Sequence, residues 1–125
     1  MLDPLLTHLL DSARDGLFLH DEDFRFISVN PAGAALLGYS QAQLLQMGLP
    51  DIEPDFDRNG IGERLRALRN GERLQTTGRP RRSDGQAVAV EVMVTALESD
   101  GRRMYAVDVR PIPRPAFPAA TYRLK

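Results

Sequence analysis

Cysteine is absent from this chain of 125 residues. Its absence excludes disulfide bonds, cysteine metal ligands and cysteine nucleophiles, and it leaves the redox compartment undecided. Tryptophan is also absent, and there are only two histidines, His8 and His20, which is too few for a histidine-based metal cluster. No apolar run approaches the roughly 18–20 residues of a membrane-spanning helix, so we expect no membrane segment.

Neither sign of charge dominates the chain. The 16 basic and 17 acidic residues leave a formal net charge of −1, which gives no general attraction to nucleic acid or to an anionic membrane. The N-terminus lacks the basic segment and small-residue cleavage site of a secretory signal, so a cytoplasmic location is expected. With 42% hydrophobic and 26% charged residues, the composition predicts one globular domain.

The first segment carries leucine at helical spacing. Residues 1–14 are predicted to form an amphipathic helix that stops at Asp15-Gly16. The apolar stripe of this helix consists of Leu2, Leu5, Leu6, Leu9 and Leu10. It is wider than the apolar face that a short helix needs to pack on one side. Either the stripe packs on its own domain, or part of it pairs with the same helix of a second chain; its width favours a homodimer.

The next segments predict a hairpin followed by short helices. Residues 17–20 and 25–29 are strand-like runs joined by an acidic turn. Asn30 and Pro31 are typical of an N-cap and first helical position, and that helix should end at Gly38. Ser40, with Gln43 three positions later, predicts a capping box.

The later segments predict another helix and three strands. A helix should span residues 61–69, with its apolar side chains on one face. Strands are expected over 73–82, 88–95 and 104–109, and the Asp84-Gly85 and Asp100-Gly101 pairs predict hairpin turns. Gly78 and Pro80 favour a bulge or an edge position for the first of these strands.

These elements predict an α+β fold, in which a five-stranded antiparallel sheet carries short helices on one face. The expected organisation is an N-terminal amphipathic helix over 1–14, a domain over 15–110, and a proline-rich linker or tail over 111–125 that cannot enter a helix or a central strand.

The order of elements, with the residues at their joints, resembles the PAS family over about residues 6–110. The matching passages are Asp15-Gly16-Leu17, residues 23–32 with Asn30-Pro31, Leu36-Leu37-Gly38-Tyr39-Ser40, Arg82-Ser83-Asp84-Gly85, residues 88–92, and Val107-Asp108-Val109. The resemblance implies a sensory or interaction module of a bacterial signal-transduction protein, linked to an effector such as a histidine kinase, a cyclic-nucleotide enzyme or a transcription regulator. It also implies frequent homodimers, and a ligand, where present, between the helices and the sheet.

Within that family the missing residues disfavour two cofactors. A light-oxygen-voltage flavin site needs a cysteine for its adduct, and this chain has none. Haem-binding relatives usually supply a histidine from the helix that here spans 61–69, and that helix has none; His8 and His20 are interpreted as a surface and a strand-end histidine. A noncovalent flavin, a small metabolite or no ligand remain open.

The predicted wall of a ligand cavity consists of residues that share an apolar side chain and an inward position. They are Phe18, Ile27, Leu36, Leu44, Ile52, Ile61, Leu65, Val90, Val92, Tyr105 and Val107. The same residues could simply fill a dry core, because packed interiors leave few voids of ligand size. The sequence favours the dry core over the ligand-holding cavity.

Other features predict no further site. The arginines at 79, 81 and 82 lack an aromatic platform and read as a solvated strand end rather than a nucleic-acid patch. Three consecutive carboxylates at 21–23 cannot converge on one ion, so no metal site is expected. The sequence offers no nucleophile and no acid–base pair at a pocket position. We therefore predict no catalytic residue and expect that the chain is not an enzyme. Arg110 replaces the usual threonine after Asp108-Val109, and Pro111 blocks a following helix, which argues against helical output there.

Overall fold

Two hairpins meet at the centre of one antiparallel sheet in the computed structural model, which describes residues 4–57 and 60–113. The strands are β1 (Gly16–Asp21), β2 (Phe26–Val29), β3 (Arg73–Gly78), β4 (Val90–Ser99) and β5 (Arg102–Pro111). Their order is β2-β1-β5-β4-β3, so the last strand in the chain lies beside the first and holds the two hairpins together. The predicted five-stranded antiparallel sheet is therefore confirmed.

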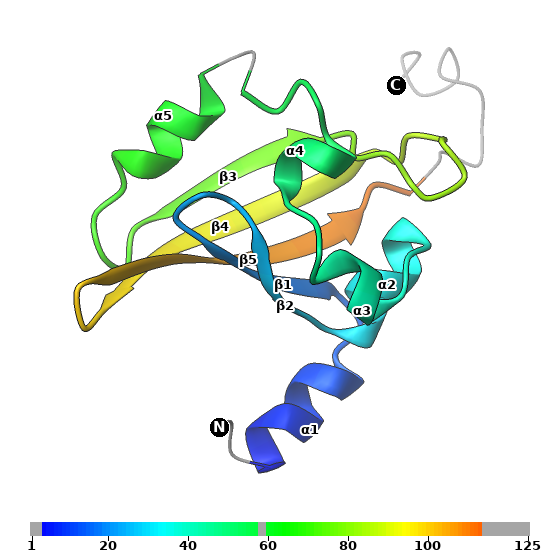
Figure 1. The fold of residues 1–125 in the computed structure, drawn as a ribbon, viewed down its shortest axis with the longest axis horizontal. Helices are drawn as coiled ribbons and strands as arrows, with labels where there is room; N and C mark the ends of the chain where they lie inside the picture. The colour runs from blue at the N-terminus through cyan, green and yellow to red at the C-terminus, as the bar shows by residue number, and fades with distance from the viewer. Residues whose placement is uncertain (1–3, 58–59, 114–125) are drawn as a thin grey trace, which may run out of the picture.

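The helices lie between β2 and β3 in the chain, except for the first. They are α1 (Pro4–Ser12), α2 (Pro31–Leu37), α3 (Gln41–Leu44), α4 (Leu49–Ile52) and α5 (Ile61–Arg66). Figure 1 shows α2 to α5 arranged along the sheet while α1 extends away from it. No helix among the described residues is long and apolar enough to cross a membrane.

Local sequence chemistry explains most of the boundaries. The Ser40–Gln43 capping box is present, and Gly38 ends α2 with a left-handed φ of 79°. Asp100 and Gly101 both have positive φ and connect Ser99 to Arg102 in a two-residue hairpin turn, as Asp-Gly pairs favour. These turn and cap predictions are confirmed.

Asn30 does more than cap α2. Its Oδ1 accepts hydrogen bonds from the backbone N–H of Gly33 at 2.9 Å and of Leu17 at 2.8 Å. Its Nδ2 donates to the carbonyls of Leu10 and Asp15, each at 3.0 Å. With the side chain only 4% exposed, this one amide joins the end of α1, the start of β1 and the start of α2.

Several predicted boundaries are wrong. The helix expected over 61–69 ends at Arg66, because the chain turns back and the Gly71 N–H donates to the Ala96 carbonyl at 2.7 Å. The strand expected from residue 88 begins at Val90, and the last strand runs through Pro111 rather than stopping at residue 109. Pro111 sits at the very end of β5, where its missing donor is tolerated.

Backbone pairing of the sheet continues just past the expected domain limit at residue 110. Pro111 pairs with Val90, and the N–H of Ile112 donates to the Ala89 carbonyl at 2.9 Å. Residues 114–125 of the predicted tail lie outside the described residues. β3 is an edge strand of the sheet, as Gly78 and Pro80 led us to expect.

The core divides into two neighbouring clusters. One gathers Phe18, Phe26, Leu37, Leu44 and Val90 with other buried residues under α2 to α4. The second gathers Phe24, Leu65, Val94, Ala96 and Tyr105 under α5. The space between the helices and the sheet that these clusters leave open is the candidate site.

Candidate functional site

A cavity of about 240 Å³ lies between the helices and the inner face of the sheet. Nine of the predicted wall residues line it: Phe18, Leu36, Ile52, Ile61, Leu65, Val90, Val92, Tyr105 and Val107. The inward side chains do not fill this space completely. Occupancy of the cavity stays a prediction.

Two predicted wall residues lie elsewhere. Ile27 is 39% exposed, and its neighbour Phe26 is buried and lines the cavity instead. Successive side chains of a strand point to opposite faces, so an error of one position moves a residue to the other side of the sheet. Leu44 is fully buried in the first cluster but does not reach the cavity.

His20 is the main wall residue that the sequence analysis missed. It is buried rather than merely at a strand end, and it lies on the cavity wall with Phe24 and Phe26. Its ring centroid is 4.7 Å from that of Phe26, and Nδ1 lies 3.3 Å from the Phe24 carbonyl oxygen. His20 lies two residues after Phe18 on β1, and side chains two positions apart on a strand face the same side of the sheet. This spacing was the sequence signal for the inward position of His20.

Burial keeps the imidazole of His20 uncharged. Removal from water lowers its pKa from 6.5 to about 4, although the Phe24 carbonyl and Asp21 both act in the opposite direction. Because the carbonyl can only accept, Nδ1 carries the proton and Nε2 is left as an acceptor. The interior of the cavity is thus uncharged near neutral pH.

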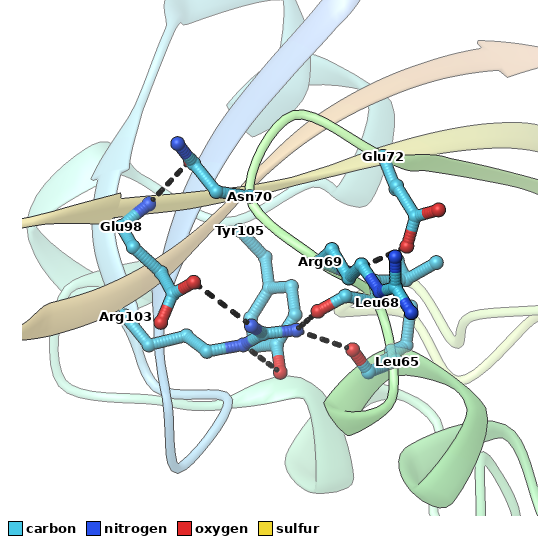
Figure 2. Close-up of polar contacts among 8 residues, drawn as sticks. All are labelled: Leu65, Leu68, Arg69, Asn70, Glu72, Glu98, Arg103 and Tyr105. Atoms are coloured by element: carbon cyan, nitrogen blue, oxygen red, sulfur yellow. Dashed lines mark hydrogen bonds and ion pairs between the residues drawn. The ribbon is translucent and has the colours of Figure 1, made fainter.

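Arg103 connects the cavity wall with the helix that covers it. Its Nη2 donates to the Leu65 carbonyl at 2.9 Å and also to the Leu68 carbonyl, and its Nε donates to the Tyr105 hydroxyl at 3.1 Å. Glu98 lies 3.8 Å from Nη1 on the preceding strand. Figure 2 shows the guanidinium between the end of α5 and β5, where it adds a charged donor to two carbonyls at and just after the end of the helix.

The opening of the cavity is polar. Glu53, Asp55 and Arg64 line the cavity together with Thr76 and Thr77 of β3, and Asp55 and Arg64 are exposed to solvent, so the polar part of the lining lies toward the opening. Glu53 is already engaged, because its Oε1 accepts the Arg79 backbone N–H at 2.8 Å. None of these polar residues was predicted, since they come from α5, from β3 and from the segment directly after α4, which are separated in the chain.

The predicted dimer helix is exposed along its leucine face. Leu5 is 69% and Leu9 58% exposed, Leu6 is also exposed, and Leu10 is half-buried. Leu2 lies outside the described residues. No described residue of α1 is buried, so its own domain leaves Leu5, Leu6 and Leu9 exposed, and pairing with a second chain stays a prediction.

Asp108 occupies the outer face of the sheet at the junction with α1. Its Oδ1 is buried without a hydrogen-bond donor among the described residues. Burial raises the pKa of this carboxyl, Asp15 raises it further, and Arg110 acts in the opposite direction. The last strand and the segment that follows α1 therefore meet through two acidic side chains.

Comparisons with known proteins agree with this architecture. The family model described as PAS fold matches residues 10–110. A PAS domain from a two-component sensor histidine kinase is 30% identical, with a TM-score of 0.73, and the match covers 86% of this chain and 94% of that chain. A PAS domain of an HTR-like protein from Haloarcula marismortui is 25% identical, with a TM-score of 0.78, covering 86% and 89%.

A more distant match extends the likeness in fold alone. The Rhodobacter sphaeroides LOV protein is 16% identical, with a TM-score of 0.72, and the match covers 89% of this chain and 66% of that chain. The comparison with curated protein sequences gave no match.

Proposed function

Because the chain belongs to the PAS family, we propose that it is the sensory module of a signal-transduction protein, which binds a small ligand in the cavity and regulates a linked effector domain. The observation that carries the proposal is the 240 Å³ cavity between α2, α4, α5 and the sheet, with an apolar interior and a polar opening. Ligand sites in proteins share this combination. In this proposal the domain itself catalyses no reaction.

The proposed ligand is smaller than a flavin or a haem. The cavity lies below the roughly 300–1,000 Å³ of sites for drug-sized molecules, and both cofactors are larger than such a space admits. The absence of cysteine removes the adduct chemistry of light-oxygen-voltage sites. His20 is held by the Phe24 carbonyl inside this small space. A small metabolite suits the residues better than either cofactor.

The proposed effector is a histidine kinase. The 30% identical match is a PAS domain of a sensor histidine kinase, and this likeness supports the same kind of partner here. A cyclic-nucleotide enzyme is the alternative effector that the family resemblance allows.

Native mass spectrometry of the chain purified from cells tests ligand binding. We expect a retained mass on the wild-type protein and its loss in Val92→Phe, because the larger ring fills the cavity. Met93→Phe is the matched control, since Met93 lies on the same strand and lines the outer face of the sheet instead. If the wild-type protein and both variants each show only the mass of the bare chain, with no retained ligand, the proposal is contradicted.

The second candidate function is a dimerisation module without a ligand. The exposed leucines of α1 favour it, because a face of this kind is usually covered by a partner. Sedimentation should show a wild-type dimer and a monomer for Leu5→Ala combined with Leu9→Ala, which retains helix propensity. Asp11→Ala on the other side of α1 should remain dimeric. A monomeric wild-type protein rules this function out.

A further inference from the structure

The cavity changes in polarity from its interior to its opening. The interior wall is aromatic and aliphatic, with buried Phe18, Phe26, Val90 and Tyr105 and the uncharged His20. An unpaired charge placed there loses its hydration without compensation. Any ionised group of a ligand must therefore stay at the opening.

Arg64 is the cation that the fold leaves available at that opening. The guanidinium of Arg66, on the same helix, lies 5.1 Å from the centroid of the Phe24 ring, and Arg103 is held by the Leu65 and Leu68 carbonyls. Arg64 lines the cavity, and its guanidinium makes no hydrogen bond or ion pair with the residues that the structure describes. Its five N–H donors fit a planar carboxylate.

A single cation limits the charge of the ligand. Among the described residues that line the cavity, Arg64 is the one arginine, and no lysine lines it. Glu53 accepts the Arg79 backbone N–H at 2.8 Å, so its carboxylate is already engaged. A second negative charge on the ligand would therefore have no cationic partner.

We propose that the ligand is an organic monocarboxylate, whose apolar body fills the interior and whose carboxylate binds Arg64; this inference rests on the sensory function proposed above. A cavity of about 150 Å³ holds benzene. By the same ratio of volume to atoms, the whole ligand, with its apolar body and its carboxylate, has about ten non-hydrogen atoms. Thr76, the half-buried threonine of the edge strand, adds one hydroxyl group to the same lining.

Isothermal titration calorimetry with three matched probes tests the assignment. The probes are 3-phenylpropionate, its neutral amide and the cation 3-phenylpropylamine, which share one apolar body. We expect 3-phenylpropionate to bind at least about tenfold more tightly than the amide, and the amine to bind weakest. Arg64→Gln should remove the preference for the carboxylate and leave the affinity for the amide unchanged, and Arg64→Lys should retain part of the preference.

Arg69→Gln is the control for a general loss of positive charge. Arg69 is exposed shortly after α5 and does not line the cavity, so this variant should keep the wild-type order of affinities. Circular dichroism on each variant confirms that the fold is retained. Equal binding of the carboxylate and the amide, or an unchanged preference in Arg64→Gln, overturns the inference.

Failure of this inference and failure of the proposed function are distinguishable. If none of the three probes binds but the protein purified from cells retains a ligand that Val92→Phe loses, the carboxylate assignment is wrong and the sensory function stands. If none binds and no ligand is retained, both are wrong.

Discussion

Arg103 and Tyr105 lie two residues apart on β5, and the Arg103 guanidinium donates to the Tyr105 hydroxyl at 3.1 Å while it also holds the end of α5. The Tyr105 ring belongs to the cavity wall, and its centroid is 5.2 Å from the guanidinium carbon. One side chain therefore fixes both the wall and the cover of the cavity (Figure 2). Loss of this side chain should loosen α5 more than it disturbs the sheet.

Arg103→Met should lower the free energy of unfolding by about 2–4 kcal/mol, because the Leu65 and Leu68 carbonyls lose a charged donor. Urea denaturation measures this loss, and hydrogen exchange should show faster exchange in α5 than in β4. Tyr105→Phe removes only one hydrogen bond and should cost no more than about 1.5 kcal/mol. Equal costs for the two variants would show that the carbonyl contacts contribute nothing.

Asn30→Ala should cost at least about 3 kcal/mol, because four backbone groups lose their partner in a buried position. Asn70→Ala is the comparison: its Oδ1 accepts one exposed hydrogen bond, from the Glu98 N–H at 2.9 Å, and its loss should cost about 1 kcal/mol. Chemical denaturation of both variants measures the difference. A cost for Asn30→Ala as small as that for Asn70→Ala contradicts the role of the amide as a junction.

The stability of the wild-type protein should fall on acidification because of His20. The unfolded chain takes up this proton near pH 6.5 and the folded chain near pH 4. Between these values the unfolded state binds more protons, so the contribution is complete above about pH 6.5 and is lost as the pH falls through 4. The loss amounts to about 3 kcal/mol.

Thermal denaturation from pH 7 to pH 4 measures that loss. His20→Phe keeps an aromatic ring against Phe18 and Phe26 and should show a shallower decline, even though it lacks the contact with the Phe24 carbonyl. His8→Gln alters an exposed residue of α1 and should follow the wild-type curve. Parallel curves for wild type and His20→Phe would refute the assignment.

Asp108→Asn should stabilise the protein at pH 7 by up to about 1 kcal/mol, because an amide removes a disfavoured negative charge and can donate to Asp15. The raised pKa of Asp108 means that the folded state takes up this proton first on acidification. The advantage of the variant should therefore shrink as the pH falls through the raised pKa.

Guanidinium denaturation at several pH values measures the difference, with Asp11→Asn on exposed α1 as the control. The control should show no comparable gain. If Asp108→Asn is less stable than wild type at pH 7, then ionised Asp108 has a favourable partner, and Arg110, which acts to lower its pKa, is the candidate.

The local signals in the chain predicted the elements well. Asn30-Pro31, the Ser40–Gln43 box and the Asp100-Gly101 turn each act through backbone groups a few residues away, so their structural effect can be inferred without knowing the fold. Helix and strand ends were less accurate. The helix from Ile61 stops early because Gly71 pairs with a residue of β4, a partner that is distant in the chain.

The candidate site was predicted in its apolar part. Alternation along β4 placed Val90 and Val92 on the inner face, whereas β2 was shifted by one residue, so Ile27 was chosen in place of Phe26. The strand is only four residues long, too short for its pattern to define which face is buried. The inward position of His20 followed from the same alternation as Phe18 and could have been predicted.

By itself the sequence determined the order of the elements, their caps and turns, and the absence of cysteine chemistry, because each depends on residue type and on near neighbours in the chain. Only the tertiary structure decided that a cavity remains, that His20 is uncharged within it, and that the Arg64 guanidinium lines it without a side-chain partner among the described residues. Burial and charge pairing depend on segments far apart in the chain, here α5 beside β3 and β5, and no local pattern specifies how closely such segments pack.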